Sequence, residues 1–430
     1  MLQILPTVCM ALSMACPAAP GAARSGAAVP PTFASAARLG SIDHAVELGL
    51  EASGFAGMSV VVGRRDTILW RRGYGALTWG DAAARVSADS TIYDLASLTK
   101  VVATTAAIMV LYDRGKLRLD DRASKFLPEL REGPKRDITI RQLLEHRSGL
   151  PAGRELWRKA RSARGARRMV LETPLAYRPG TRQIYSDLGA DVLGFVAEAV
   201  SGEPLDTFTR RNVFTPLRMT STMFRPSARV RSRVAPTERF SSRGHPLRGE
   251  VHDPNAYALG GVAGHAGLFA TASDLAIFAR MMLGGGSYHG VRIVSDSTVA
   301  LFTRRVAGTR ALGWETCAGG ASCGQHMGER AFGHTGFTGT SIWIDPEREL
   351  FIIVLTNRIH ELPGGRVPPG AVLADVRADI ADIAELSLAD GGVLPEMPSR
   401  LRADRAIGWP TPATVSAISS GEAWRAREPF

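Results

Sequence analysis

The chain has 430 residues, of which 45% are hydrophobic and 22% charged. This composition is typical of a globular protein and excludes a disordered chain, a collagen-like fibre and a polytopic membrane protein. Lys and Arg together number 52 against 41 Asp and Glu, a formal net charge of +11. Nearly all the cations are Arg, and no Lys follows Lys159. This bias indicates genomic composition, so the charge by itself predicts no polyanionic partner.

The first residues have the pattern of a secretory leader. Leu2–Ala15 is apolar but too short to span a bilayer, and small residues follow it. We therefore predict a signal peptide over residues 1–24, cleaved near Ala19 to Ala23, and a Pro/Ala/Ser-rich linker over 25–40. These predictions imply export to the periplasm or the extracellular space. Membrane contact is expected only through the leader or through lipidation of Cys16.

Beyond the linker, two hairpin patterns lie near opposite ends of the chain. Ser41–Leu50 is predicted to be a capped helix. A hairpin pattern follows, with two strands, Met58–Val62 and Thr67–Trp70, on either side of a turn. Near the other end, Thr340–Asp345 and Leu350–Leu355 form a second pair of apolar strands around a Pro-Glu-Arg-Glu turn. Both hairpins predict antiparallel strands that are covered by helices.

The middle of the chain, about residues 117–283, carries mostly helical patterning with loops rich in Pro and Gly. The expected fold class is therefore α+β, with an antiparallel sheet built from both chain ends, flanked by helices, and a mostly helical region inserted between. This arrangement predicts one domain over residues 41–389. Residues 390–430 are rich in Pro, Ser, Arg and Ala, and we expect a poorly ordered tail.

One motif places a hydroxyl beside an ammonium. Ser97 and Lys100 stand at i and i+3 at the start of the apolar stretch Val101–Leu111, so they share a helix face. Backbone N–H groups at a helix N-terminus can hold an oxyanion, and a hydroxyl becomes a nucleophile once a base takes its proton. Taken alone, Ser-x-x-Lys is frequent by chance, and helix capping is the structural alternative.

Two further motifs follow in order. Ile184-Tyr185-Ser186-Asp187 leads into the apolar stretch Leu188–Val200, and Gly333-His334-Thr335-Gly336 precedes the second hairpin. With Ser97 and Lys100, they resemble the penicillin-recognising serine hydrolases, in the branch of class C β-lactamases, D-Ala-D-Ala carboxypeptidases and related esterases. The stretches 139–151, 259–269 and 272–275 strengthen a resemblance that spans about Ser41 to Asn357. It implies a β-lactamase/transpeptidase-like fold over residues 41–389.

The resemblance implies an acyl-enzyme mechanism. Ser97 would attack a carbonyl, Tyr185 would be the base, and Lys100 would position the Ser proton and lower the pKa of its neighbours. The backbone N–H groups of Ser97 and Phe337 would form the oxyanion hole. The other motif residues would lie around the substrate: Asp187, His334, Thr335 and Gly336. No metal or organic cofactor is implied.

The chain departs from the family pattern at two positions. His334 stands where Lys is common, and His titrates near neutrality whereas Lys holds a fixed charge. Asp187 stands where β-lactamases usually have Asn, and an ionised carboxylate cannot donate a hydrogen bond; it would pair with Lys100. Both departures argue against an efficient β-lactamase and leave acyl transfer intact. Arg358 is a candidate to replace the missing Lys, with an anchoring salt bridge as the alternative.

Several other residues leave alternatives open. His252-Asp253 and His265 suggest a metal or, more simply, structural hydrogen bonds, and His146 suggests a loop anchor. Cys317 and Cys323 form either a local disulfide or two lone thiols. The run of cations from Arg154 to Arg168 holds a single aromatic residue, Trp157, and not the repeated interleaved aromatics of nucleic-acid binders, which predicts a solvated helix face and no nucleic-acid partner.

The sequence thus predicts an exported serine hydrolase that acts on a small-molecule or peptide substrate. A peptidase acting on D-alanyl cell-wall peptides is the first hypothesis, and an esterase or a β-lactamase is the alternative within enzymes. The alternative from another class is a catalytically silent cell-wall-binding module. Such a module has no need to retain Ser97, Lys100 and Tyr185 together.

Overall fold

The computed structural model describes residues 34–53, 55–80, 82–319, 322–361, 370–388, 394–399 and 401–402. The predicted signal peptide, Cys16 and most of the predicted linker lie outside these residues. So does most of the predicted tail. In its described part, Arg402 pairs with Asp382 and Leu401 packs into a hydrophobic cluster.

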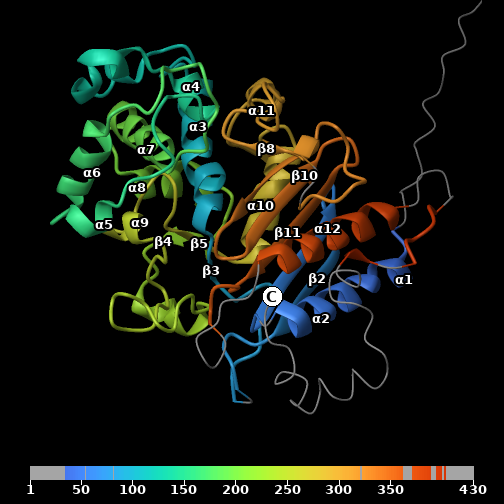
Figure 1. Cartoon of the computed structure of the whole chain (residues 1–430). Coiled ribbons are helices and arrows are strands. Elements are labelled where there is room, and N and C mark those ends of the chain that lie inside the picture. The colour runs from blue at the N-terminus through green and yellow to red at the C-terminus, as the bar shows by residue number, and fades with distance from the viewer. Residues whose placement is uncertain are drawn as a thin grey trace, which may run out of the picture.

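A six-stranded sheet joins the two ends of the chain (Figure 1). In spatial order its strands are β2 (Thr67–Gly75), β1 (Gly57–Arg64), β11 (Leu350–Thr356), β10 (Thr340–Asp345), β9 (Phe332–Gly336) and β8 (Glu315–Thr316). Every neighbouring pair is antiparallel, and β1 lies beside β11 with Met58 opposite Thr356. Both predicted hairpins and the predicted fold class are confirmed.

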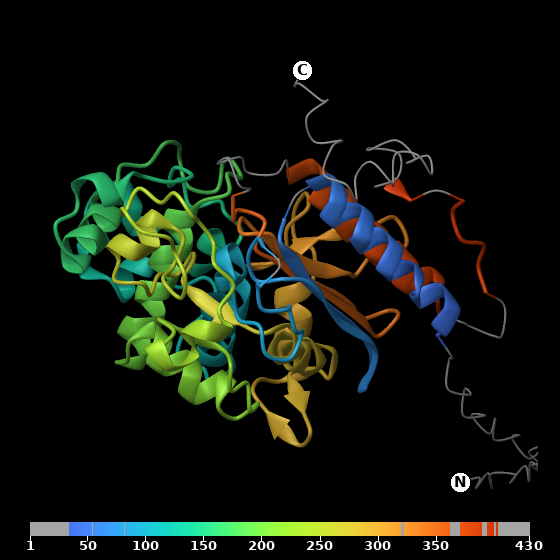
Figure 2. The ribbon, with the colours of Figure 1, turned by 90° about the horizontal axis from the view of Figure 1, so that it is seen from below.

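Both faces of the sheet are buried, since almost every residue of the central strands β1, β10 and β11 is buried. Successive side chains of a strand point to opposite faces. Val60 and Val62 therefore pack into one hydrophobic cluster, while Val61 packs into the other. The helices α2 (Ser41–Ser53) and α12 (Gly370–Leu386) lie side by side over the first face, as Figure 2 shows.

The opposite face packs against α10 (Ala272–Leu283), which contacts β1, β10 and β11. Beyond α10 lies a mostly helical half that contains α3 (Ala106–Asp113), α4 (Ile140–Leu144), α5 (Leu156–Lys159), α6 (Ala163–Glu172), α7 (Asp187–Ser201), α8 (Leu205–Thr209) and α9 (Pro254–Ala258). Figure 1 shows this half beside the sheet.

Short elements complete the fold. A small sheet has the order β3 (Tyr93–Asp94), β5 (Leu268–Ala270) and β4 (Met223–Phe224), and β6 (Ser287–Tyr288) pairs with β7 (Val291–Arg292). The remaining helices are α1 (Ala36–Leu39) and α11 (Asp296–Thr303).

The segment Ala96–Asp113, which ends in α3, is long and apolar enough to cross a membrane by length and composition. However, 83% of its residues are buried inside the fold. Its apolar side chains belong to the largest hydrophobic cluster of the described residues. Its hydrophobicity is therefore accounted for by the core of the helical half.

Candidate active site

Ser97 lies on a turn between the small sheet and the buried helix of the helical half. The turn is a 3-10 helix, Ala96–Leu98, and a π-helix, Lys100–Thr105, continues into α3. Ala96 has a φ of 45° and donates its N–H to Asp94 Oδ1 at 2.9 Å. Because the left-handed region is unfavourable for a residue with a Cβ atom, the surrounding contacts hold this turn in place. The side chain of Ser97 stays partly exposed.

Lys100 is buried, and each of its three ammonium hydrogens has an acceptor. Its Nζ lies 2.9 Å from Ser97 Oγ, 2.7 Å from Asp187 Oδ1 and 3.2 Å from the carbonyl oxygen of His265. Burial alone would lower the pKa of Lys100, but the interactions with Tyr185 and Asp187 outweigh it and raise the pKa. Lys100 is therefore a fixed cation that donates to Ser97 and leaves the hydroxyl proton of Ser97 free for another acceptor.

Asp187 is the counter-ion of this ammonium. Burial would raise the pKa of its carboxyl, but the charge of Lys100 outweighs burial and lowers the pKa. Because a carboxylate accepts and never donates, Asp187 cannot replace the amide that donates to a substrate carbonyl. The predicted pairing of Asp187 with Lys100 is present in the structure.

Tyr185 lies at the centre of a ring of cationic and imidazole groups. Its aromatic ring has the Nζ of Lys100 4.8 Å from its centroid and the guanidinium of Arg310 5.2 Å away. The rings of His146 and His334 lie 4.6 Å and 5.9 Å from it, centroid to centroid. Tyr185 therefore lies between two cations, Lys100 and Arg310, that both face its ring.

His146 supports the segment that carries Tyr185. It adopts a φ of 55°, and its Nδ1 accepts the N–H of Ser186 at 3.1 Å. Ser186 is in turn the N-cap of α7 and donates its hydroxyl to the carbonyl of Pro151. Burial lowers the pKa of His146, so its ring stays neutral and accepts at Nδ1. This is the anchoring role that the sequence predicted for it.

The edge of β9 is docked against the backbone that precedes Ser97. Thr338 Oγ1 donates to the carbonyl of Asp94 at 2.7 Å, and Thr340 Oγ1 donates to the carbonyl of Leu95 at 2.9 Å. A Cβ atom at Gly336 would lie 2.1 Å from Thr340 Oγ1 and 2.5 Å from Leu95 O. No side chain fits there, so the approach of β9 to the Ser97 turn requires this glycine.

His334 is a neutral, buried imidazole. Its Nδ1 donates to the carbonyl of Thr335 at 2.7 Å, so its Nε2 is an acceptor, and among the described residues this buried atom has no hydrogen-bond partner. Burial and the charges of Arg310 and Lys100 lower the pKa of His334 to about 3. A group that is neutral at neutral pH cannot supply the fixed charge of the usual lysine.

Phe337 carries an exposed ring beside β9, with 63% of the residue accessible to solvent. The ring of His252 stacks on it at a centroid distance of 5.6 Å. Arg358 Nη2 donates to the carbonyl of Phe337 at 2.8 Å, so this guanidinium is engaged with the backbone of the predicted oxyanion hole. Thr335 lies half-buried on β9 between His334 and Gly336.

Arg310 is the site residue that sequence reasoning missed. It lies between α11 and β8 with 15% of its side chain exposed, and its only ion pair within the described part of the chain is a loose one with Glu315, at 3.8 Å. Its buried Nη1 has no hydrogen-bond partner among the described residues. No motif marks it in an Arg-rich chain, because its closeness to Tyr185 arises only from the tertiary fold.

The histidines and cysteines left open by the sequence also have partners. His265 binds carboxylates through both ring nitrogens, Asp191 at 2.7 Å and Asp253 at 3.0 Å. Cys317 and Cys323 form a disulfide with their Cα atoms 6.0 Å apart. The disulfide follows directly on β8, the strand that flanks β9.

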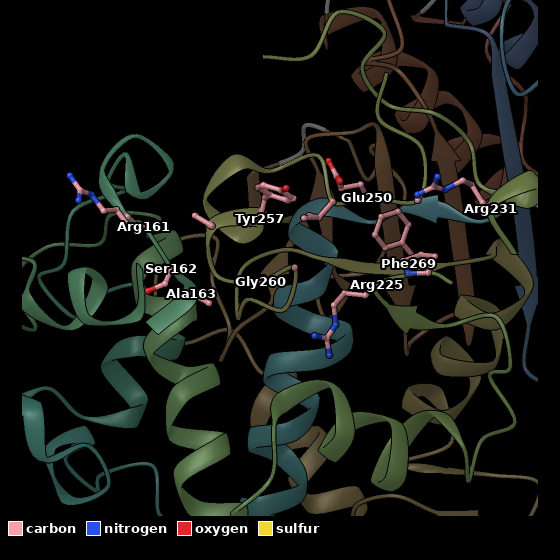
Figure 3. A pocket seen from close by; sticks show the side chains of 15 residues that line it. Arg161, Ser162, Ala163, Arg225, Arg231, Glu250, Tyr257, Gly260 and Phe269 are labelled. Atoms are coloured by element: carbon pink, nitrogen blue, oxygen red, sulfur yellow. The ribbon is translucent and has the colours of Figure 1, made fainter. Parts of the chain in front are cut away.

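A separate pocket of about 550 Å³ lies in the helical half, and none of its lining residues belongs to the Ser97 cluster. Figure 3 shows Arg225, Arg231 and Tyr257 along its wall. Arg225 is paired with Asp206, and the Glu250 carboxylate of the wall is bound by Arg243 at 2.7 Å. These two charged side chains of the wall are thus paired with residues that do not line the pocket.

Comparisons with known proteins agree with this geometry. The Beta-lactamase family model matches residues 42–377. A protein of Escherichia coli K12 named "Putative D-alanyl-D-alanine carboxypeptidase" is 33% identical over 361 residues, which are 75% of this chain and 83% of the relative. An N-acetylmuramyl-L-alanine amidase of Bacillus subtilis is 34% identical over 364 residues, 76% of this chain and 82% of that protein.

Solved structures share the fold at lower identity. The D-alanine carboxypeptidase AmpC from Burkholderia cenocepacia superposes with a TM-score of 0.63 at 21% identity, over 81% of this chain and 99% of that one. EstCE1, a hydrolase with promiscuous acyltransferase activity, has a TM-score of 0.64 at 21% identity over the same shares. With a family match over most of its length and relatives one-third identical to it, the chain belongs to the β-lactamase family of serine hydrolases.

Proposed function

We propose that the protein cleaves the terminal residue from D-alanyl peptides through an acyl-enzyme on Ser97. The observation that carries this proposal is the saturated ammonium of Lys100, which donates to Ser97 Oγ at 2.9 Å and to Asp187 at 2.7 Å. A cation in this position stabilises negative charge that develops on Ser97 Oγ and orients the hydroxyl proton away from Lys100. Tyr185 is then the acceptor for that proton.

Ser97 Oγ attacks the substrate carbonyl, its proton passes to the phenolate oxygen of Tyr185, which becomes a neutral phenol, and the backbone N–H groups of Ser97 and Phe337 bind the oxyanion. Collapse of the tetrahedral intermediate breaks the peptide bond, and the proton from Tyr185 leaves on the departing amine. Water then attacks the ester with Tyr185 as base, and Ser97 regains its proton. His334, Thr335 and Gly336 line the substrate side of β9.

The names of two similar proteins support amide cleavage beside alanine, since one is a D-alanyl-D-alanine carboxypeptidase by name and the other an N-acetylmuramyl-L-alanine amidase. A cell-wall substrate would require export of the protein, which we propose as well. We also propose that the catalytic domain spans residues 41–389. The second candidate function is an esterase, which the neutral His334 favours because an uncharged acyl group needs no cation.

The test combines product release with intact-mass spectrometry. Wild type, Ser97→Ala and the exposed control Ser90→Ala are incubated with a D-Ala-D-Ala peptide, a nitrophenyl ester and a penicillin. We expect release of D-alanine and a penicillin adduct with wild type and Ser90→Ala, and neither with Ser97→Ala.

The other outcomes decide between the alternatives. Cleavage of the ester without release of D-alanine would favour an esterase. Penicillin hydrolysis without a lasting adduct would favour a β-lactamase. If no substrate or adduct separates wild type from Ser97→Ala, the catalytic proposal is wrong and a binding module remains.

A further inference from the structure

A buried cluster of charged groups lies directly behind Lys100. His265 is 2% exposed and Asp191 is 1% exposed at their side chains, while Asp253 retains 31%. The three residues come from separate elements, since Asp191 is on α7, His265 is in the loop before β5, and Asp253 is the N-cap of α9. The cluster therefore joins three parts of the helical half beside the nucleophile.

The hydrogen bonds of the cluster define its charge. Asp191 Oδ1 lies 2.7 Å from Nδ1 of His265, and Asp253 Oδ1 lies 3.0 Å from Nε2. Asp253 Oδ1 also accepts the N–H of Ala256, and Asp191 Oδ1 also accepts the N–H of His265. A carboxylate can only accept, so a ring that meets carboxylates at both nitrogens donates from both and is an imidazolium.

Charged groups on the neighbouring elements agree with an imidazolium. Asp187 and Asp191 stand four residues apart on one face of α7, so the first binds Lys100 while the second binds His265. With Asp253, three acidic side chains surround the two cations. Burial raises the pKa of Asp191, whereas at Asp253 the charge of His265 outweighs burial and lowers the pKa, so Asp253 is the firmly ionised partner of the ring. Burial would lower the pKa of His265, but Asp191 and Asp253 outweigh it and raise the pKa well above the usual value.

The cluster reaches Lys100 through the backbone. The carbonyl of His265 accepts from Lys100 Nζ at 3.2 Å, and the preceding carbonyl, of Gly264, accepts from Thr104 Oγ1 at 2.6 Å. A Cβ atom at Gly264 would lie 2.0 Å from the carbonyl of Ala190, so this loop lies directly against α7. Two consecutive carbonyls are thus docked on the helix that carries Lys100.

We propose that Asp191, His265 and Asp253 form a positioning unit in which a permanently charged imidazolium fixes the His265 carbonyl against Lys100. The carbonyl is one of the three acceptors of the Lys100 ammonium. Ser97 Oγ and Asp187 accept two of the ammonium hydrogens, and the imidazolium, held by its two carboxylates, keeps the His265 carbonyl in position to accept the third. With all three bonds made, Lys100 stays an ammonium and keeps Ser97 Oγ in place. The unit acts through Lys100 and has no contact with substrate.

The direct test is an NMR measurement of the protonation states of Lys100 and His265. The chain has five lysines and nine histidines, so labelled Lys Cε and His ring signals are sparse and assignable by substitution. In the wild type we expect both ring nitrogens of His265 to stay protonated from about pH 5.5 to 9, a range in which an ordinary His titrates.

Asp253→Asn removes one charge and little else, because Asn is also an efficient N-cap and its side-chain oxygen still accepts from Nε2. We expect His265 to titrate within that range in this variant. As the ring loses its proton, the Lys100 Cε signal should shift and the rate of Ser97 acylation, relative to wild type, should fall on the order of 10- to 100-fold. The substrate KM should change little.

Glu238→Gln is the matched control, because it neutralises a carboxylate that also pairs with a histidine, His252, at 3.1 Å. We expect this variant to leave the Lys100 signal and the relative acylation rate unchanged at every pH. A purely structural role for Asp253 would lower the melting temperature and leave the ratio of acylation rates independent of pH.

The proposal is overturned if His265 titrates in the wild type, or if Asp253→Asn leaves both the Lys100 signal and the pH dependence of acylation as in wild type. It rests on the proposed role of Ser97, but the two can fail separately. If wild type forms no acyl-enzyme with any donor, the proposed function fails, whereas the His265 and Lys100 signals still decide whether the cluster fixes the ammonium.

Discussion

At the scale of single residues, the neutral state of His334 changes how a substrate carboxylate can be bound. Its pKa of about 3 follows from burial and from two neighbouring cations, Arg310 and Lys100. A lysine at position 334 would bring a third positive charge to the same place. We propose Arg310 as the source of the permanent charge, since it faces Tyr185 and its buried Nη1 lacks a partner among the described residues.

We therefore predict that Arg310→Gln lowers kcat/KM for a D-Ala-D-Ala peptide by about 10- to 100-fold, the value of a hydrogen bond to a charged group. The same peptide with an amidated C-terminus, and a neutral ester, should react at the wild-type rate. Between about pH 5.5 and 8 the loss should be constant, because an arginine and a histidine of such low pKa do not titrate there.

The measurement is steady-state hydrolysis of the three substrates by wild type, Arg310→Gln and the exposed control Arg304→Gln, which should behave as wild type. An equal loss on all three substrates would show that Arg310 acts on Tyr185 or on folding and does not recognise a carboxylate.

Part of the site was predictable from residue spacing and part was not. Ser97 and Lys100 were predictable because the i, i+3 spacing on a helix face is a local property. Arg310 and the partners of His265 were not, because they depend on which loops meet in space. For His252, Asp253 and His265 the sequence favoured structural hydrogen bonds over a metal, but it could not name the partners, which are Asp191 and Asp253 for His265.

At the scale of elements, the junction between β9 and the Ser97 turn depends on Gly336. Gly336→Ala would place a Cβ atom within 2.5 Å of the carbonyl of Leu95 and closer still to Thr340 Oγ1. Because the clash involves backbone, β9 must move away from Ser97. We predict a loss of acylation rate on the order of 100-fold, as expected for a misplacement of about 1 Å between reacting groups.

Acylation by penicillin, followed by intact mass, measures this loss. Gly153→Ala, at an exposed glycine with open space around it and no positive φ, is the control for an alanine replacing glycine. Wild-type acylation by Gly336→Ala would contradict the inferred junction.

Element types also show where sequence reasoning stopped. The hairpins were predictable because their strands are apolar and bounded by turns. The helix after Ser97 was predicted from its hydrophobicity, but its first turns are a 3-10 helix and a π-helix. The type of helix depends on tertiary contacts such as the hydrogen bond from Thr104 to the carbonyl of Gly264. A hydrophobic pattern carries no information about such contacts.

At the scale of the whole molecule, α12 closes one face of the sheet and carries a buried acid. Burial, together with Asp345, raises the pKa of Glu385 to about 9, and Arg348 at 3.6 Å offsets only part of this. Below about pH 4.5 the carboxyl is protonated in both the folded and the unfolded chain. As the pH rises, the unfolded chain releases this proton while the folded chain keeps it, so stability declines towards pH 9.

Glu385→Gln removes this dependence. We predict that the substitution raises the free energy of unfolding by about 1–3 kcal/mol near pH 8.5 and changes it little near pH 5. Thermal melts at the two pH values, beside the exposed control Glu129→Gln, measure the difference. A variant that is less stable than wild type at the higher pH would show that the pair with Arg348 dominates.

The overall architecture was predictable because both chain ends carry apolar strands, which become buried when they pair in one sheet. What remained hidden was the outer part of the sheet, since β8 and β9 are short and rich in glycine and polar residues. The small sheet was hidden as well, because its strands are two or three residues long.

The pairing of β1 with β11 also sets an order of events during synthesis. Met58 pairs with Thr356, and the carbonyls before Ser97 are held by hydroxyls at positions 338 and 340. Contacts so distant along the chain close late, after most of the polypeptide exists. A nascent chain that already contains Ser97, Lys100 and Tyr185 thus still lacks the segment that fixes the nucleophile. The hydrolase stays inactive until its last strands have been synthesised and paired.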